Sequence, residues 1–195
     1  MREVVQMVLV LFGISTVCGA ALSGIRQATA ERIEYQVLMN VQGPKVNKVL
    51  AGSENDLISD RAKVLVKGEK LLLFVGKKGG RPWAVAYETT GKGFGGELKL
   101  MVGYDLKEDK LVGIEVVSHK ETPGLGSRVT EDQFKSQFAG LEIDARFLLK
   151  NEGGDIDAVS GATYSSRAVC EAIRKSIALY PEVKRHVLQN IGSKG

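Results

Sequence analysis

The chain has 195 residues, of which 44% are hydrophobic and 26% charged, a composition typical of a folded protein and not of a disordered one. Its net charge is +4, and it has no dense basic run interleaved with aromatic residues, which argues against nucleic-acid binding. There are two cysteines and two histidines but neither a CxxC spacing nor a Cys/His cluster, so the sequence predicts no metal site.

The first element is an apolar segment. Residues 4–25 contain no charged side chain, and as a helix they would span roughly 30 Å, enough to cross the hydrocarbon core of a membrane. A cleaved signal peptide is the alternative, because residues 28–30 form a small-x-small cleavage site. However, the apolar stretch is longer than a usual signal core of ~7–15 residues, and Arg2 is the one basic residue before it. A lipid anchor on Cys18 has less support. We therefore expect residues 1–30 to be a retained, single-pass membrane anchor.

Residues 26–60 are polar and mixed in composition, which predicts short helices and loops, and we assign residues 31–60 to a connecting segment. From residue 61 onward, apolar and polar residues alternate, which predicts β-strands. The expected strands are two within 62–77, joined by a turn at 67–70, and one each at 83–90, 97–105, 111–119 and 146–150. The strands at 97–105 and 111–119 are predicted to pair as an antiparallel hairpin.

Two helices complete the predicted elements. One is expected from Glu131 to about Ala139, with Thr130 as its N-terminal cap and acidic residues in its first turn. The other follows residues 157–166, because apolar residues then recur at a spacing of four, and Pro181 is expected to end it. Strands joined by hairpins and followed by helices indicate an α+β fold with an antiparallel sheet, which we assign to a domain at residues 61–195.

The glycine-rich stretch GKGFGGELKL, residues 91–100, resembles a dinucleotide-binding loop only superficially. That motif needs a strand before it and a helix after it, whereas here a strand follows. Two interpretations stay open: a flexible loop in which glycines accept positive φ angles, or a backbone that closely approaches a flat ligand. The sequence contains no Walker A motif.

A second stretch, HKETPGLG at residues 119–126, ends a strand and enters a turn. It is either a simple strand exit or a wall of a ligand site, in which Glu121 and Thr122 would offer polar groups and Leu125 an apolar face. His119 has no nucleophile partner nearby in sequence, so we interpret it as a structural residue at the strand end.

The third stretch, DAVSGATYSS at residues 157–166, places the hydroxyls of Ser160, Thr163, Ser165 and Ser166 at an expected helix start. One of them could simply cap the helix, a contribution of about 1 kcal/mol. A helix start also presents free N–H groups and partial positive charge, which suit a phosphate. The small residues Gly161 and Ala162 would let the backbone approach it. From the residues alone, plain capping and phosphate binding both remain open.

The string from Asp157 to Thr163 resembles the flavinylation motif Asp-x-x-Ser/Thr-Gly-Ala-Thr. The chain is similar to the FMN-binding G subunit of the Rnf electron transport complex and, more distantly, to the C subunit of the sodium-pumping NADH:quinone reductase. The N-terminal anchor, the ETPGLG loop at 121–126 and the strand at 95–105 support the resemblance, which covers most of the chain. Residues 26–60 contain no matching motif.

The resemblance implies that a flavin transferase moves FMN from FAD onto Thr163, where it stays as a covalent phosphoester. It implies an electron-carrier subunit, without a complete active site, of an ion-translocating ferredoxin:NAD oxidoreductase. The expected partners are the flavin transferase and the other membrane subunits, and the expected location is the cytoplasmic (inner) membrane with the FMN domain on its extracytoplasmic side. The implied cofactor contacts are Ser160, Gly161, Ala162, Thr163, Ser165 and Ser166 around the phosphate and Glu121, Thr122, Pro123, Gly124, Leu125 and Gly126 near the flavin ring.

The alternative from a different class is a non-redox, membrane-anchored binding module whose helix start holds a phosphate. A hydrolase that uses Thr163 or Ser160 as its nucleophile is less well supported, because no paired base can be named.

Overall fold

The structure, a computed structural model, describes residues 1–190, and it divides the chain into two compact units, residues 1–40 and a unit that begins at Val41. The first unit consists mainly of helix α1, Arg2–Val37, none of whose side chains is buried. The helical run from Arg2 to Val49 includes a window of mean hydropathy 2.1, and within residues 1–190 it is the one helix long and apolar enough to cross a membrane. The helix continues past residue 30 because no glycine or proline interrupts it there.

Two short helical segments follow α1. A π-helical turn at Leu38–Gln42 spans the boundary between the two units, and helix α2, Gly43–Val49, comes next with a proline in its first turn. Val46 and Val49 of α2, with Leu50 after it, are buried. The prediction of a short helix between residues 31 and 60 is therefore confirmed, while the domain boundaries drawn at residues 30 and 60 stay predictions.

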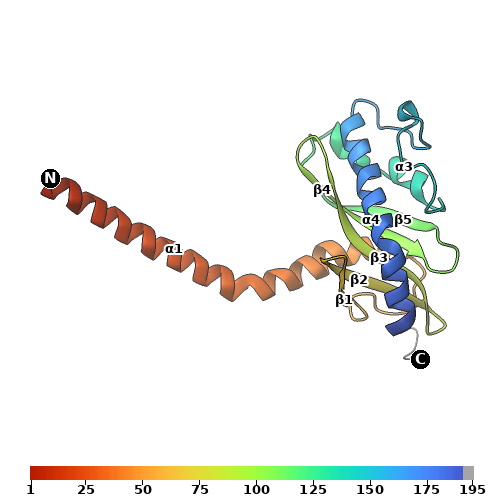
Figure 1. Cartoon of the computed structure of the whole chain (residues 1–195), viewed down its shortest axis with the longest axis horizontal. Helices are drawn as coiled ribbons and strands as arrows, with labels where there is room; N and C mark the ends of the chain where they lie inside the picture. The colour runs from red at the N-terminus through yellow and green to blue at the C-terminus, as the bar shows by residue number, and fades with distance from the viewer. Residues whose placement is uncertain (191–195) are drawn as a thin grey trace. The chain divides into compact units, whose positions relative to one another are not determined.

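The core of the second unit is a five-stranded antiparallel sheet in the order β1-β2-β3-β4-β5 (Figure 1). The strands are β1 Ala62–Val66, β2 Glu69–Lys78, β3 Arg81–Lys92, β4 Glu97–Asp105 and β5 Leu111–Ser118. Each strand pairs with the next one along the chain, so the predicted hairpin of β4 and β5 is confirmed, with Val102 opposite Ile114. The α+β class is confirmed as well.

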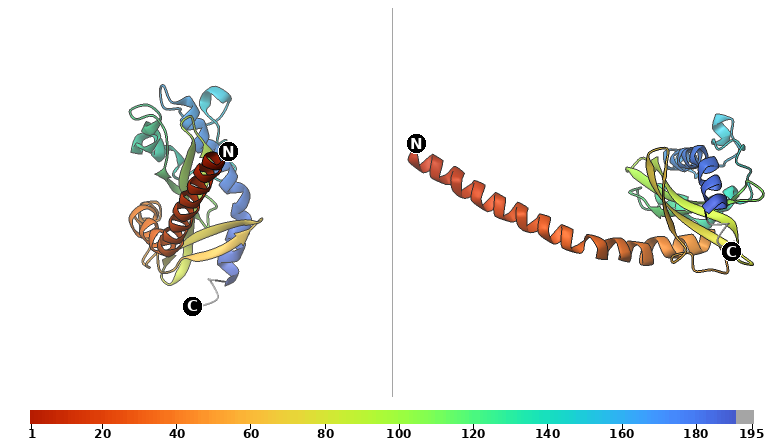
Figure 2. Two further views of the ribbon diagram at one scale, coloured as in Figure 1. Left: turned by 90° about the vertical axis from the view of Figure 1, so that its left-hand side faces the viewer. Right: turned by 60° about the horizontal axis from the view of Figure 1, so that its bottom comes forward.

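Both faces of the sheet are buried. Helix α4, Thr163–Asn190, lies across one face, and Figure 2 shows the same packing from two other directions. Helix α2 packs against β4 and β5 on the other face, where a side chain at Gly103 would overlap Val49 at 2.4 Å. Because both faces are covered, the central strands β3 and β4 carry near-continuous buried runs.

Helix α4 is held to β3 by three contacts in register. Tyr87 O–H donates to the Ser176 carbonyl at 2.8 Å, and Thr89 O–H donates to the Ala172 carbonyl at 3.0 Å. At Gly91 an added Cβ would lie 2.1 Å from the Ala168 carbonyl oxygen. The contacts recur every two residues along β3 and every four residues along α4. Two strand residues advance ~6.6 Å and four helix residues ~6 Å, so the two elements stay in step where they run side by side. The register fixes where α4 begins relative to the end of β3.

Replacing Gly91 with alanine should disturb this register. The new methyl group would overlap the backbone of α4, which cannot move aside as a side chain can. We expect Gly91→Ala to lower the free energy of unfolding by about 1–3 kcal/mol, measured by denaturant titration. Gly113→Ala in β5 is the matched control, because no atom lies within 4 Å of its added Cβ. Equal stability of the two variants would contradict the close approach.

The predicted helix from Glu131 to Ala139 is wrong in its extent. The structure has a 3-10 turn at Gly126–Thr130, one turn of α-helix, α3, at Asp132–Lys135, and another 3-10 turn at Ser136–Phe138. Thr130 does not cap α3, because its hydroxyl donates back to the Ser127 carbonyl at 2.8 Å. Phe134 and Phe138 are buried, so tertiary packing holds this irregular segment.

Two further expectations need correction. Residues 146–150 form no strand: Leu149 makes a single bridge to Ile156, and a 3-10 turn follows at Lys150–Glu152. Gly153, with φ of 83°, then reverses the chain before pairing can extend. Pro181 does not end α4, which runs on to Asn190. Beyond it, Val183 and Val187 are fully buried, and this burial offsets the backbone hydrogen bond that the proline lacks.

The turn between β4 and β5 is fastened to α4 by an acidic residue. The Asp109 carboxylate accepts hydrogen bonds from Tyr180 O–H at 2.6 Å and Lys184 Nζ at 2.5 Å. Partial desolvation acts to raise the pKa of Asp109, but these two hydrogen bonds and the Lys184 charge outweigh it, so the pKa is lowered.

A lowered pKa makes this link sensitive to acid. The stabilisation is present above the unfolded-state pKa of about 3.9 and is lost as the pH falls through the lower folded-state pKa. We expect Asp109→Asn to be less stable than the wild type at pH 7, with a difference that shrinks as the pH is lowered below about 4. Urea unfolding at stepped pH measures this, with Asp144→Asn at an exposed position as the control. A difference that stays constant down to low pH would contradict the role of Asp109.

Candidate functional site

Three segments far apart in sequence meet at the upper end of the domain in Figure 1: the tip between β3 and β4, the loop after β5, and the start of α4. They line an open cavity of about 450 Å³. Its lining residues are Phe94, Glu121, Thr122, Leu125, Gly126, Gly161, Ala162, Thr163, Tyr164 and Ser165. Both stretches that the sequence singled out, 119–126 and 157–166, therefore contribute to one cavity.

Glu121 joins the three segments. One carboxylate oxygen accepts a hydrogen bond from the Gly95 N–H at 3.0 Å, and the other accepts a short one from the Ser165 hydroxyl. The backbone N–H of Glu121 donates to Nδ1 of His119 at 3.2 Å, so His119 stabilises the backbone where β5 ends. The Glu121 side chain is almost fully buried, so these bonds replace its contacts with water.

The glycines at the β3–β4 tip make room for Glu121. A Cβ at Gly93 would lie 2.2 Å from the Glu121 carboxylate, and one at Gly95 would lie 1.9 Å from the Lys120 carbonyl oxygen. On the loop side, a Cβ at Gly126 would lie 2.6 Å from both the Glu121 carboxylate and the Ser165 hydroxyl. The glycine-rich stretch thus permits close packing between segments of the protein.

The start of α4 is stabilised by Ser166. Its buried hydroxyl accepts a hydrogen bond from the Val159 N–H at 3.0 Å and donates to the Ala162 carbonyl at 3.0 Å. Gly161 turns the chain with φ of 77°. The first backbone bond within the helix runs from the Ser166 N–H to the Ala162 carbonyl. The N–H groups of residues 163–165 precede that bond, so they are the free donors that a helix start offers to an anion.

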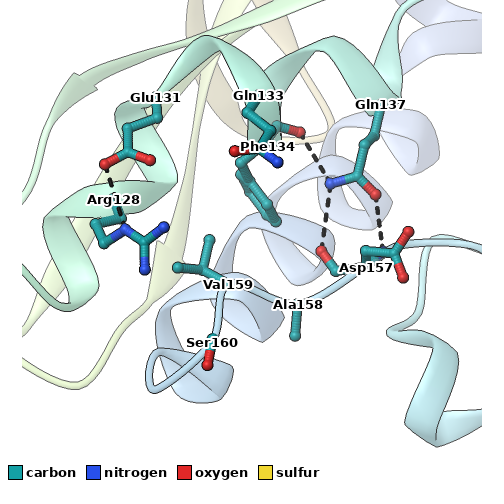
Figure 3. A pocket seen from close by; sticks show the side chains of 9 residues that line it. All are labelled: Arg128, Glu131, Gln133, Phe134, Gln137, Asp157, Ala158, Val159 and Ser160. Atoms are coloured by element: carbon teal, nitrogen blue, oxygen red, sulfur yellow. Dashed lines mark hydrogen bonds and ion pairs between the residues drawn. The ribbon is translucent and has the colours of Figure 1, made fainter.

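The remaining predicted site residues lie outside the cavity lining. Ser160 is exposed and lines a neighbouring pocket of about 230 Å³, which Figure 3 shows between Arg128 and the stretch 157–160. Pro123 and Gly124 form the exposed turn of the loop, where the Gly124 N–H donates to the Ser127 hydroxyl at 2.9 Å.

Gln137 holds the beginning of the 157–166 stretch, a role that sequence reasoning missed. Its side-chain oxygen accepts from the Asp157 N–H at 2.8 Å, and its amide nitrogen donates to the Asp157 carbonyl at 3.3 Å (Figure 3). Lys150 Nζ contacts the Asp157 carboxylate at 2.6 Å. Because Gln137 lies 20 residues before Asp157, no local pattern pointed to this pair.

Sequence reasoning also missed two aromatic residues. Phe94 and Tyr164 both line the cavity, and their ring centroids are 6.2 Å apart in an edge-to-face arrangement. The two residues are 76% and 62% exposed, so they offer a paired aromatic surface beside Thr163. The sequence signal that could have identified them is their position: Phe94 lies among the glycines of residues 91–96, and Tyr164 directly follows Thr163.

Comparison with known proteins gives a consistent result. Residues 93–178 match the family model of the FMN-binding domain. The chain is 31% identical to the G subunit of the ion-translocating oxidoreductase complex of Shewanella loihica, over 92% of this chain and 90% of the relative. It is 28% identical to the G subunit of the proton-translocating ferredoxin:NAD(+) oxidoreductase complex of Clostridium ljungdahlii, over 73% of this chain and 78% of the relative.

The fold is shared with a solved structure, Shewanella oneidensis NqrC, at a TM-score of 0.50 and 19% identity, over 69% of this chain and 71% of that chain. The apolar helix α1 and the G-subunit relatives together indicate a membrane-anchored protein. Identity at this level along nearly the whole chain decides the classification: the chain belongs to the family of G subunits of ion-translocating oxidoreductase complexes.

Proposed function

We propose that this chain carries FMN attached through a phosphoester to Oγ1 of Thr163, and that it transfers electrons within an ion-translocating ferredoxin:NAD oxidoreductase complex. The observation that carries the proposal is the convergence of residues 121–126 and 157–166 on one cavity with Thr163 in its wall. The FMN-binding family match over residues 93–178 and the name of the Clostridium ljungdahlii relative support the cofactor and the complex.

The start of α4 suits the phosphate. Thr163 is its first residue, is half-buried and lines the cavity, so a group bonded to its hydroxyl would lie next to the free N–H groups of the first helical turn. Those N–H groups and the helix dipole stabilise negative charge. Gly161 and Ala162 keep the approach free of bulky side chains. Thr163 is therefore the attachment point that we propose.

The rest of the cavity suits the flavin ring. Its volume of about 450 Å³ lies within the usual range for small-ligand sites. Phe94, Leu125 and Tyr164 offer apolar and aromatic surfaces, while Glu121, Thr122 and Ser165 offer polar atoms. FMN supplies the redox chemistry, because the flavin ring accepts and releases electrons. The protein residues bind the ring, orient it and limit its contact with water.

Attachment requires a second protein. We propose that a flavin transferase breaks the pyrophosphate bond of FAD, that the Thr163 oxygen forms the new bond to phosphorus, and that AMP leaves while the hydroxyl proton passes to a base or to solvent. The one carboxylate among the described residues of the cavity lining, that of Glu121, already accepts from the Gly95 N–H and the Ser165 hydroxyl, which is consistent with activation of Thr163 by an external enzyme. The flavin domain would lie on the extracytoplasmic side of the cytoplasmic membrane, next to the other membrane subunits.

The test is to produce the full chain in membranes with and without a flavin transferase. We expect flavin fluorescence that stays on the denatured protein band when the transferase and FAD are present, and no fluorescent band when the transferase is omitted. A colourless protein in the presence of an active transferase would favour the non-redox binding module, in which the start of α4 holds only a free phosphate.

A further inference from the structure

Tyr164 is held by a chain of two charged residues. The Arg167 guanidinium lies 5.2 Å from the centre of the Tyr164 ring, within range of a cation–π interaction. The Arg167 side chain is itself fixed by Glu152, whose carboxylate accepts from Nε at 2.8 Å and through a second, shorter bond from the guanidinium. Glu152 ends the 3-10 turn at residues 150–152, so a loop outside the cavity lining reaches the aromatic wall through Arg167.

We propose that the Glu152–Arg167 pair positions Tyr164, and that Tyr164 and Phe94 together form a fixed aromatic wall that immobilises the flavin ring. This inference rests on the proposed function. It adds a positioning role for Glu152 and Arg167, which lie outside residues 121–126 and 157–166, and a common role for Phe94 and Tyr164. Arg167 and Glu152 are positioning residues, because they act on the flavin through Tyr164.

A covalent phosphoester alone would not hold the ring. The bond at Thr163 fixes the phosphate, but a flexible ribityl chain separates the phosphate from the ring. Electron transfer depends on the distance and angle between the ring and its partners, and a contact at the ring end would keep both constant. Exposed aromatic faces provide one, because aromatic rings stack favourably and lose little conformational entropy on binding.

The contacts around the wall restrain Tyr164 from two sides. The planar guanidinium of Arg167 donates two hydrogen bonds to one carboxylate oxygen of Glu152, and these restrain its position beside the ring. The Tyr164 ring is therefore contacted by Arg167 and by the edge-to-face ring of Phe94. With both neighbours in place, the Tyr164 side chain is held beside the cavity before any ligand arrives.

The test is time-resolved fluorescence anisotropy of the covalently bound flavin in the full chain, produced with a flavin transferase and purified in detergent. For the wild type we expect the anisotropy to decay only with the slow tumbling of the whole particle. Tyr164→Ala and Phe94→Ala should add a fast phase, on the picosecond-to-nanosecond scale of free side-group motion, with loss of most of the slow amplitude. Tyr164→Phe keeps the ring and should keep the slow decay.

The positioning role is tested by Arg167→Met and Glu152→Ala, which leave residues 157–166 unchanged. Both should show the fast phase, and Arg167→Lys should restore part of the slow amplitude because it keeps a cation near the ring. Arg185→Ala, an exposed arginine on the same helix, is the matched control. Slow decay in Tyr164→Ala and Phe94→Ala would overturn the aromatic wall, and slow decay in Arg167→Met and Glu152→Ala would overturn the positioning.

These outcomes are distinct from failure of the proposed function. If no flavin remains on the denatured wild-type chain, covalent attachment is wrong, and the inference is overturned together with the proposed function. If flavin remains and every variant tumbles as the wild type does, attachment stands and this inference is wrong.

Discussion

The Thr163→Ala variant is expected to carry no covalent flavin when it is produced with an active transferase. Alanine lacks the oxygen that forms the phosphoester, while the helix start keeps its buried Ser166 bonds and should stay folded. The loss of covalent flavin should be complete, because without that oxygen the phosphoester cannot form at all. Fluorescence of the denatured band and the intact mass of the purified protein both measure it.

Two variants sharpen that result. Thr163→Ser retains a hydroxyl at the same position and should retain flavin, although its extra freedom can slow the attachment. Ser160→Ala should also retain flavin, because Ser160 lines the neighbouring pocket (Figure 3). If Thr163→Ala keeps covalent flavin and Ser160→Ala loses it, the flavin is attached to Ser160 and the proposal is contradicted.

The second large effect is expected at Glu121. Its removal in Glu121→Ala leaves the Gly95 N–H and the Ser165 hydroxyl without their acceptor in a buried place. Each unsatisfied group costs about 1–3 kcal/mol, so we expect the free energy of unfolding to fall by about 3 kcal/mol. The three segments of the cavity would also lose their common contact, so the flavin ring should become more exposed to solvent. Denaturant titration and quenching of flavin fluorescence by iodide measure the two effects.

Glu121→Gln is the informative comparison. The amide can still accept from the Gly95 N–H and can donate to the Ser165 oxygen, so we expect a smaller loss of stability than in Glu121→Ala. Glu97→Ala, at an exposed position in β4, is the control for removing an acidic side chain near the cavity. If Glu121→Ala is as stable as Glu97→Ala, Glu121 does not join the three segments.

The parts of the fold that depend on local pattern could be predicted from the sequence. The alternation in residues 97–105 and 111–119 follows from a sheet with side chains on opposite faces, and it predicted the β4–β5 hairpin. The four-residue spacing of Val169, Ile173 and Ile177 predicted the helix α4. In both cases the signal lies within a few residues, so no knowledge of distant contacts was needed.

The errors arose where distant contacts decide the structure. The stretch at 146–150 has the apolar residues of a strand, but a glycine turn and the single bridge to Ile156 prevent a ladder. A proline usually ends a helix, yet α4 continues beyond Pro181 because Val183 and Val187 are buried against the core. Local preferences are weak, and packing overrode them at both places.

The candidate site was predictable as two motifs but not as one cavity. Residues 121–126 and 157–166 stand out in the sequence, and eight of the residues named there line the cavity with Phe94 and Tyr164. Their meeting depends on Glu121, which reaches Gly95 and Ser165 from 26 and 44 residues away in sequence. The glycines of residues 91–96 could be recognised as unusual, but only the structure connects them to the space that Glu121 occupies.

The most direct measurement of the central claim is the intact mass of this protein isolated from its native membrane. We expect the mass of the chain increased by that of one FMN less one water, with the increment on the peptide that contains Thr163. An unmodified chain, or an increment on a peptide without Thr163, would contradict covalent attachment at this residue.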